Sequence, residues 1–183
     1  MILDGGACEV GLESTVVSIE RNDQDFYQLS ILRAGQVTQS EIEQSLTPKF
    51  EFKFVAVSDK KSAPGQMKHH YMPEIPLILV KNSKLSEKEI LEQTKIRLQQ
   101  LPDEIDSVQI RKPTELNHLV EMILPKDAAL SARKLYSELR SLAEREDSQA
   151  IFFRLQNYHE SEDWIAAIDR LKKAASLILD KNS

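Results

Sequence analysis

The chain has a single cysteine, Cys8, among its 183 residues, so it cannot form an internal disulfide. Structural disulfides belong mainly to secreted proteins, and their absence indicates a reducing setting and predicts a cytoplasmic location. No apolar run reaches the length that spans a bilayer, so we expect no membrane partner. No basic stretch followed by an apolar core opens the chain, and a secretory signal peptide is therefore not predicted.

An excess of positive charge is also missing. Lys and Arg number 24 against 29 Asp and Glu, which gives a formal net charge of −5. Free-standing nucleic-acid-binding domains usually carry a basic surface, so this balance argues against that class, although a local basic patch stays compatible with it.

Sequence motifs that bind phosphate or metal are absent as well. The chain contains neither G-x-G-x-x-G nor a Walker A sequence, and no internal repeat. His69 and His70 are adjacent but have no further ligands at zinc spacing, so no metal site is predicted.

Hydrophobic residues make up 41% of the chain, enough for a core, and those near the N-terminus follow a strand pattern. Residues 12–19 and 26–32 are rich in β-formers on either side of a polar turn, which predicts a hairpin. Residues 38–41 read Thr-Gln-Ser-Glu, a capping box that predicts a short helix over 41–46. Alternating phenylalanines at 50–54 predict a half-buried strand.

From residue 58 the composition changes, and the chain divides into three predicted parts. Residues 58–74 are charged and then interrupted by proline and glycine, which is typical of a mobile linker with little regular structure. We therefore expect one domain over 1–57, a linker over 58–74 and a second domain over 75–183.

Apolar runs alternate with helical stripes in the second predicted domain. Such alternation favours a parallel sheet with crossover helices, so we expect a Rossmann-like α/β domain after a mostly β segment. The expected strands cover 76–80, 105–110 and 150–155, and the expected helices cover 90–101, 116–123, 128–142 and 164–178.

Three residues near the first strands are candidates for binding an anion. Ser14 and Thr15 stand where a strand begins, and Arg33 stands where the next one ends. Hydroxyls and a guanidinium can hold a phosphate or carboxylate, whereas the plain alternatives are ordinary strand propensity and a solvated arginine. Gly5-Gly6 predicts a turn that needs positive φ, and Cys8 predicts a small buried hydrophobe.

Basic residues also occur along the last two predicted helices. Because acidic residues are interspersed among them, we interpret these cations as solvated helix faces rather than as a phosphate or RNA site. Trp164 lies at a core-facing position, which favours packing over base stacking. The cations are Arg133, Lys134, Arg140, Arg170, Lys172 and Lys173.

Two segments together carry a family resemblance. Residues 4–17 read DGGACEVGLESTVV, and residues 31–36 read ILRAGQ. They resemble the end of the YrdC-like domain of the threonylcarbamoyl-AMP synthase family, whose pattern runs roughly DGG-x-C-x-x-G-x-EST-V-V and then LRPG. Ala34 stands where the family usually has proline, which is a mild departure.

The resemblance continues along most of the chain. Residues 63–66 and 70–73 resemble the interdomain linker of the long, two-domain form of that enzyme, and residues 132–140 and 167–174 resemble the last helices of its C-terminal domain. The first segments and the linker are specific, whereas the helical patterns are common in any α/β domain.

The resemblance implies a nucleotidyltransferase that makes L-threonylcarbamoyladenylate from threonine, bicarbonate and ATP, with Mg²⁺, and so serves tRNA threonylcarbamoyladenosine modification. On this view Ser14, Thr15 and Arg33 bind nucleotide or substrate. The resemblance also implies that the linker closes over the site, with Pro64, Gly65, His70 and Tyr71 in this segment. The alternative, which stays open, is a surface linker that its prolines only stiffen.

The family's cation-rich strand and its Ser-Ala-Asn segment have no counterpart here, so no catalytic residue is carried over. We therefore expect a C-terminal fragment that is inactive alone and binds neither ATP nor Mg²⁺. Two alternatives stay open: an RNA-binding, translation-factor-like module with an indirect link to tRNA, and a regulatory domain that pairs with a separate catalytic half. The apolar strands of residues 1–57 further predict self-association.

Overall fold

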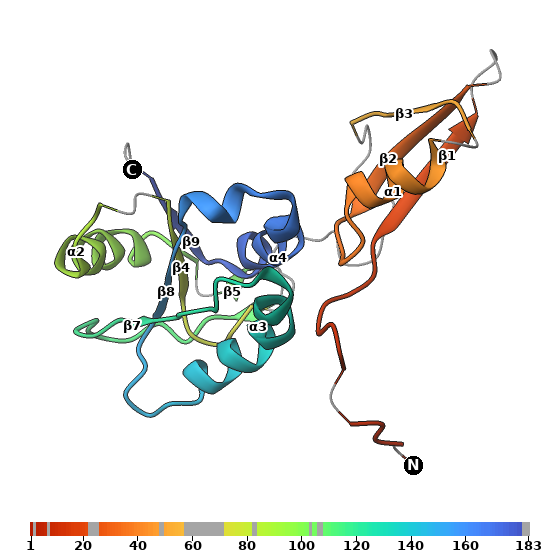
Figure 1. The fold of residues 1–183 in the computed structure, drawn as a ribbon. Helices are drawn as coiled ribbons and strands as arrows, with labels where there is room; N and C mark the ends of the chain where they lie inside the picture. The colour runs from red at the N-terminus through yellow and green to blue at the C-terminus, as the bar shows by residue number, and fades with distance from the viewer. Residues whose placement is uncertain are drawn as a thin grey trace.

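The computed structural model describes residues 1, 3–6, 8–21, 26–47, 50–56, 72–81, 84–102, 104–105 and 108–180, and the statements below concern these residues. They form a mixed α/β structure with a three-stranded sheet near the N-terminus and a four-stranded sheet in the rest of the chain (Figure 1). All pairings in the four-stranded sheet are parallel, which confirms the expected α/β class.

The predicted N-terminal hairpin is present. β1 (Val16–Arg21) pairs antiparallel with β2 (Tyr27–Arg33), whereas the expected turn at 22–25 lies outside the described residues. The first strand was expected to begin at Leu12, but it begins at Val16. We call the three-stranded sheet with its helix the N-terminal unit, and the four-stranded sheet with its helices the parallel-sheet unit. Leu12 packs against the core of the parallel-sheet unit, so the chain before β1 connects the two units.

A helix and a third strand complete this N-terminal unit. α1 (Gln39–Leu46) begins at the predicted capping box, where Thr38 and Glu41 exchange side-chain and backbone hydrogen bonds. β3 (Phe52–Phe54) then pairs in parallel with β2, and its phenylalanines are half-buried while Lys53 is exposed, as the alternation predicted.

Part of the apolar surface of this unit stays open to solvent. Leu29 is buried, but Ile19 is 62% exposed and Phe50 is 51% exposed. Self-association through these strands remains a prediction.

The parallel sheet has the strand order β7-β8-β4-β9. Its strands are β4 (Leu77–Val80), β7 (Val120–Glu121), β8 (Ile151–Arg154) and β9 (Leu177–Leu179). β4 and β8 lie in the middle, and every residue of β4 is buried. An apolar run without alternation is typical of such a central parallel strand.

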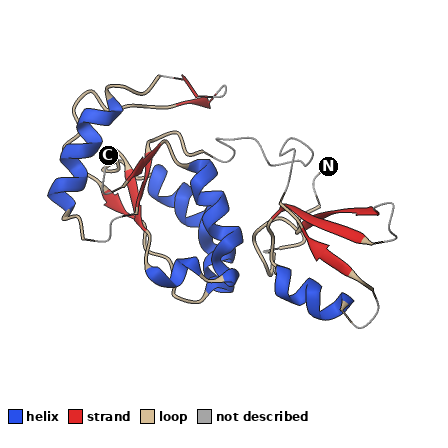
Figure 2. Ribbon diagram, turned by 90° about the horizontal axis from the view of Figure 1, so that it is seen from above, coloured by secondary structure: helices blue, strands red, loops and turns tan. Residues whose placement is uncertain are grey.

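Helices cover both faces of the parallel sheet (Figure 2). On one face α2 (Glu87–Leu98) packs against Ile78, Val80 and Phe152, and on the other α3 (Ala128–Ala143) and α4 (Ile165–Ala174) pack against the alternate residues of the same strands. Two cores therefore share one sheet, as the two-residue period of β-strands requires. None of the helices in the described part of the chain is both long and apolar enough to cross a membrane.

The expected helix over 116–123 is wrong. Leu116, Leu119, Val120 and Ile123 have helical spacing, but the structure places β7 there. Val120, Met122 and Leu124 are buried and Ile123 is 78% exposed, so this segment has the period of a strand.

The expected final helix is too long. α4 ends at Ala174, Ala175 is extended, and Ile178 belongs to the edge strand β9 rather than to the helix. Ser176 stabilises the extended backbone after α4 by bonding to β4. Its N–H donates to Leu77 O, and its hydroxyl accepts from Leu77 N.

The expected single strand over 105–110 is also wrong. The chain forms a small separate hairpin there, with β5 (Glu104–Ile105) antiparallel to β6 (Val108–Gln109). Neither strand pairs with the parallel sheet.

Two expectations near the N-terminus have opposite outcomes. Cys8 is exposed, so the prediction of a buried thiol is wrong. Gly6 has φ 84° and its N–H donates to Asp4 Oδ1 at 2.8 Å, which confirms the predicted turn.

Two short 3₁₀ helices, η2 (Asn157–Glu160) and η3 (Glu162–Trp164), precede α4 and place a histidine in an aromatic core. His159 is 6% exposed, and its Nδ1 accepts from Gln156 N at 2.9 Å. The Trp164 ring lies 4.3 Å from the imidazole, which confirms that this tryptophan packs in the core. Burial lowers the pKa of His159, because the charged imidazolium loses its hydration there.

This lowered pKa makes folding stability depend on pH. The unfolded chain binds a proton at His159 below about pH 6.5, whereas the folded chain resists it. Stability is therefore complete above about pH 6.5 and falls as the pH drops toward the folded pKa, by at most about 1.4 kcal/mol per pH unit. We expect the free energy of unfolding, measured by urea titration at pH 7.5 and 5.5, to fall more in the wild-type chain than in His159→Asn. Equal falls in both would contradict this.

Candidate functional site

The candidate site is built from two short segments that flank the hairpin strands, residues 13–15 before β1 and residues 33–35 at the end of β2. We call these two segments the wall. Val16 is paired with Arg33, and the register shifts between Val16 and Val17. The three residues predicted from the sequence, Ser14, Thr15 and Arg33, therefore lie together at one end of the hairpin.

Arg33 joins the two segments directly. Its Nε donates to Ser14 O at 3.0 Å, and its Nη2 donates to Ser14 Oγ at 3.1 Å. We call this pair of hydrogen bonds the clasp. These two bonds fix the direction of the guanidinium, although they lie at the exposed surface.

The hydroxyls of the wall have different partners. Thr15 Oγ1 donates its proton to Val37 O at 2.7 Å, so this hydroxyl does not offer the proton to a ligand. Ser14 Oγ accepts from Arg33, and a hydroxyl that accepts a bond still carries a proton that it can donate. Ser14 and Arg33 together can therefore present one donor hydroxyl and one cation to an anionic group.

Gly35 sets how closely the two segments approach. A Cβ at this position would lie 2.2 Å from Thr15 N, 2.4 Å from Ser14 C and 2.6 Å from Glu13 O. Every one of these atoms belongs to the backbone, so no side-chain rotation makes room. The Arg-Ala-Gly corner is thus a close backbone contact that only glycine allows.

The C-terminal helices contact the wall through a buried arginine. Arg170, on α4, is 3% exposed; its Nε donates to Glu13 Oε2 at 2.8 Å, and its Nη2 donates to Ala34 O at 3.0 Å. Its Nη1 also donates to Asp169. Our interpretation of Arg170 as part of a solvated helix face is therefore wrong.

Two further side chains complete this group. Lys173 Nζ lies 2.8 Å from Asp169 Oδ2, and Tyr136 Oη, from α3, lies 3.4 Å from both oxygens of Glu13. We call Glu13, Tyr136, Asp169, Arg170 and Lys173 the interface cluster. It contains two cations and two carboxylates, so the buried guanidinium is neutralised.

The charge of Arg170 is held in place by these partners. Burial lowers the pKa of its guanidinium, but the hydrogen bond and charge of Glu13 and the charge of Asp169 outweigh burial and leave the pKa raised. Arg170 therefore stays a cation that bonds both segments of the wall at once.

A second contact joins the two units nearby. Ser40 N, in the first turn of α1, donates to Glu162 Oε1 at 2.9 Å, and the Ser40 hydroxyl donates to the other carboxylate oxygen. These two bonds lower the pKa of Glu162, the hydroxyl bond contributing most. The carboxylate lies at a helix N-terminus, where negative charge is favoured.

A cavity of about 1120 Å³ lies between the N-terminal unit and the parallel-sheet unit, which is large enough for a nucleotide. Arg33, Ala34 and Gly35 line one side of it, and Asp169, with other residues of α4 and β9, lines the other. The segment 33–35 of the wall therefore borders on solvent-accessible space between the units.

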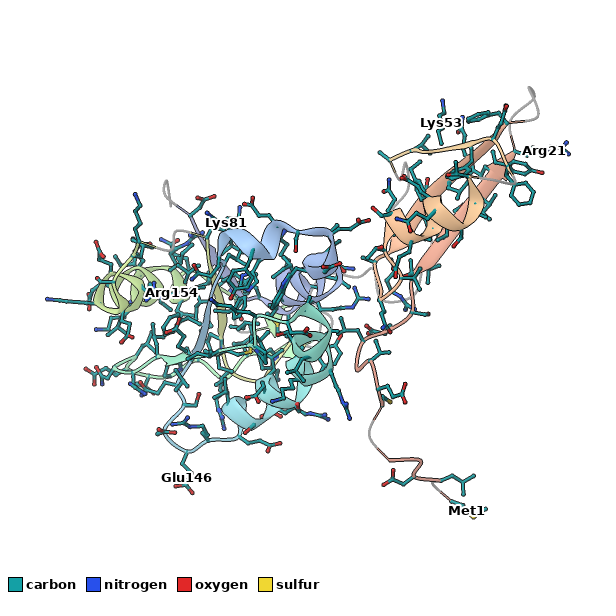
Figure 3. The ribbon with its side chains drawn as sticks, in the orientation of Figure 1. Met1, Arg21, Lys53, Lys81, Glu146 and Arg154 are labelled. Carbon is teal, nitrogen blue, oxygen red and sulfur yellow. The ribbon has the colours of Figure 1, made fainter. Side chains whose placement is uncertain are left out.

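The carboxyl edge of the parallel sheet, where open α/β sheets commonly bind ligands, is occupied by ion pairs instead. Arg154 Nε lies 3.1 Å from Glu121 Oε1, and Lys81 Nζ lies 3.3 Å from Asp180 Oδ2. Lys81 and Arg154 lie on the parallel-sheet unit, whereas Arg21, on β1, and Lys53, on β3, lie at the far end of the N-terminal unit (Figure 3). Arg33 is thus the hairpin cation that faces the cavity.

The expected linker residues and possible metal ligands complete the survey of the site. Pro64, Gly65, His70 and Tyr71, assigned to the linker, lie outside the described residues. Within the described ranges, no group of three or more His, Cys, Asp or Glu is placed to hold a metal ion.

The interface cluster was missed although its sequence contained a signal. Ala167, Arg170, Leu171 and Ala174 fall on one helical face by spacing, and all four are buried. A basic residue at a core-facing position is rarely buried without a partner, so its position alone indicated a buried ion pair. The identity of that partner, Glu13, could not follow from spacing because it lies 157 residues away.

Comparisons with known proteins identify the family to which the chain is similar. The family model described as "Threonylcarbamoyl-AMP synthase, C-terminal domain" matches residues 37–176. A threonylcarbamoyl-AMP synthase of Schizosaccharomyces pombe (strain 972 / ATCC 24843) is 30% identical over 197 residues, covering 98% of this chain and 46% of that protein. The chain therefore spans somewhat less than half the length of this curated relative.

A solved structure is similar in fold. The crystal structure of P. abyssi Sua5 complexed with L-threonine has a TM-score of 0.57 and 21% sequence identity, covering 97% of this chain and 50% of that chain. At this identity the likeness concerns the fold alone.

Proposed function

Because the chain belongs to the family of the threonylcarbamoyl-AMP synthase C-terminal domain, we propose that it works as the C-terminal part of an ATP-dependent L-threonylcarbamoyladenylate synthase. The reaction joins L-threonine, bicarbonate and ATP into threonylcarbamoyl-AMP, with release of pyrophosphate and water. The product serves the threonylcarbamoyladenosine modification of tRNA.

The observation that carries this proposal is the clasp. Arg33 lines the cavity and is hydrogen-bonded to Ser14, so this pair offers a cation and a hydroxyl donor to an anion. The adenylate and the carboxylates of this reaction are anions, and guanidinium groups bind them with strong, charge-assisted hydrogen bonds. In this proposal Arg33 and Ser14 bind and orient a substrate anion, while Thr15 holds the turn that follows β2.

The chemistry of bond formation is assigned to the part of the relatives that this chain does not match. Since the described residues group no three metal ligands, we assign no Mg²⁺ contact and no reaction step to them. The chain supplies one wall of the site and the parallel-sheet unit that supports it, so we propose that it makes no product alone.

A chimera tests this function. The unmatched part of the S. pombe relative is joined to this chain in place of its own matched half, and pyrophosphate release is measured with ATP, threonine and bicarbonate. We expect release above background that needs all three substrates, and none from this chain alone. Arg33→Ala in the chimera should lower the rate at least about tenfold, because a hydrogen bond to a charged group contributes about 1.5–3 kcal/mol.

The matched control is Arg21→Ala, which removes an arginine from the same hairpin at its far end (Figure 3). We expect it to keep most of the rate. Turnover by this chain alone that disappears in Arg33→Ala would contradict the proposal that the chain is inactive alone. A chimera that folds yet releases no pyrophosphate above background would overturn the proposed function.

A further inference from the structure

We infer that Arg170 is a positioning residue: from helix α4 it holds the two segments of the wall in register, so that Arg33 can form its clasp with Ser14. The inference rests on the proposed function only for the identity of what the wall binds. According to this inference, the geometry of the wall depends on the C-terminal helices, although its hydroxyl groups, on Ser14 and Thr15, belong to the N-terminal part of the chain.

The sequence positions of its partners carry the inference. Glu13 directly precedes Ser14, and Ala34 directly follows Arg33. Arg170 bonds Glu13 and Ala34 at 2.8 and 3.0 Å, so two guanidinium groups span the same pair of segments at adjacent residues. One belongs to the wall itself and the other belongs to a helix of the other unit.

Burial makes this contact rigid. Arg170 is 3% exposed, and its fork fixes two bond directions at once, which an ammonium group cannot do. Tyr136 and Lys173 in turn contact Glu13 and Asp169, so both carboxylate partners of Arg170 are held from α3 and α4. A displacement of α4 would therefore be transmitted to the wall through the Arg170 side chain.

An ion pair that only attaches the two units makes a different prediction. Such a pair would stabilise the contact between the units and leave the clasp unchanged when it is weakened. A positioning role requires that the hydrogen bond from Arg33 Nε–H to Ser14 O weakens although Arg33 itself is intact.

The test is the solvent exchange of the Arg33 Nε–H, followed by NMR in the wild-type chain and in Arg170→Lys, without any ligand. Lysine keeps the charge but cannot bond Glu13 and Ala34 O together. We expect exchange at Arg33 to be at least about tenfold faster, as follows from weakening one hydrogen bond to a charged group. The backbone signals of Ile78 and Phe152 should stay in place and show that the parallel sheet is folded.

Arg140→Lys is the matched control, since Arg140 is exposed on α3. It should leave Arg33 unchanged. Glu13→Gln serves as a second variant, because it removes the charge that faces Arg170 and nearly keeps the side-chain volume. It should accelerate exchange at Arg33 in the same direction, and it keeps the inference testable if Arg170→Lys fails to fold.

Unchanged exchange at Arg33 in a folded Arg170→Lys or Glu13→Gln chain would overturn the positioning role and leave the proposed function standing. An inactive chimera would overturn the proposed function and leave a measured effect on Arg33 standing. The two failures are therefore distinguishable.

Discussion

Replacing Gly35 by alanine is expected to separate the two segments of the wall, residues 13–15 and 33–35. It should destabilise the N-terminal unit by about 3 kcal/mol, which is the upper part of the usual range for overpacking. The new methyl group would lie 2.2 Å from Thr15 N and 2.4 Å from Ser14 C. Because these are backbone atoms, the two segments must separate. Hydrogen exchange of the amides of residues 14–17 and 33–37 measures the effect.

Gly5→Ala is the matched control, since a Cβ at Gly5 has no neighbour within 4 Å. It should leave these amides unchanged. Separation of the segments also pulls Ser14 away from Arg33, so the chimera should lose activity in Gly35→Ala about as much as in Arg33→Ala. Unchanged amide protection in Gly35→Ala would show that the approach of the two segments is not as close as described.

The second large effect is expected at the centre of the parallel sheet. Phe152→Ala should lower the free energy of unfolding by about 3–5 kcal/mol, because it leaves a cavity in a core that cannot collapse fully. Phe152 is 1% exposed in β8, and Arg154 lies 5.2 Å from its ring centre, so the substitution also removes a cation–π contact. Stabilities of folded domains are about 5–15 kcal/mol, so the loss is a large fraction of the total.

Fluorescence of Trp164 during a urea titration can follow this loss, since Trp164 is the only tryptophan and is buried in the same unit. Phe50→Ala is the control, because Phe50 is 51% exposed in the N-terminal unit. It should cost clearly less than Phe152→Ala, because much of Phe50 is already exposed and its edge contact with Tyr27 contributes only about 0.5–1.5 kcal/mol beyond its burial. Equal losses in the two variants would contradict the described core.

Local chemistry explains which elements could be predicted from the sequence. The capping box at Thr38 placed the start of α1 within two residues, because the cap satisfies backbone N–H groups of its own first turn. α2 begins three residues before its expected start at residue 90, at a capping box formed by Ser86 and Glu89. The central strand β4 was likewise identified from its continuous apolar run.

Two errors came from short strands whose period was hidden. Leu116, Leu119, Val120 and Ile123 match a helical stripe, yet Val120, Met122 and Leu124 are the buried residues. A two-residue strand such as β7 gains its stability from pairing with β8, and that pairing partner is not visible in the local sequence. The second error is the final helix, which was expected to continue to residue 178. No glycine or proline in the sequence marks the end of α4 before Ser176.

The candidate site was predictable only where its residues resembled a known pattern. Ser14, Thr15 and Arg33 were identified in that way, and the structure brings Arg33 to Ser14. Glu13 and Ala34 stand beside them in the sequence but were not assigned, because their partner Arg170 comes from the opposite end of the chain. Contacts of such long range follow from the fold and not from spacing.

The central position of β4 has a consequence for how the chain is synthesised. Leu77 pairs with Ile151 and Ile78 pairs with Leu177, so both neighbours of β4 leave the ribosome roughly 70–100 residues after it. At about 5–20 residues per second, this strand waits for on the order of ten seconds before its sheet can close. During that time four apolar side chains, all buried in the finished fold, stay exposed on the nascent chain. Its biosynthesis should therefore be sensitive to chaperone supply, and premature termination before residue 177 should leave β4 with one edge permanently unpaired.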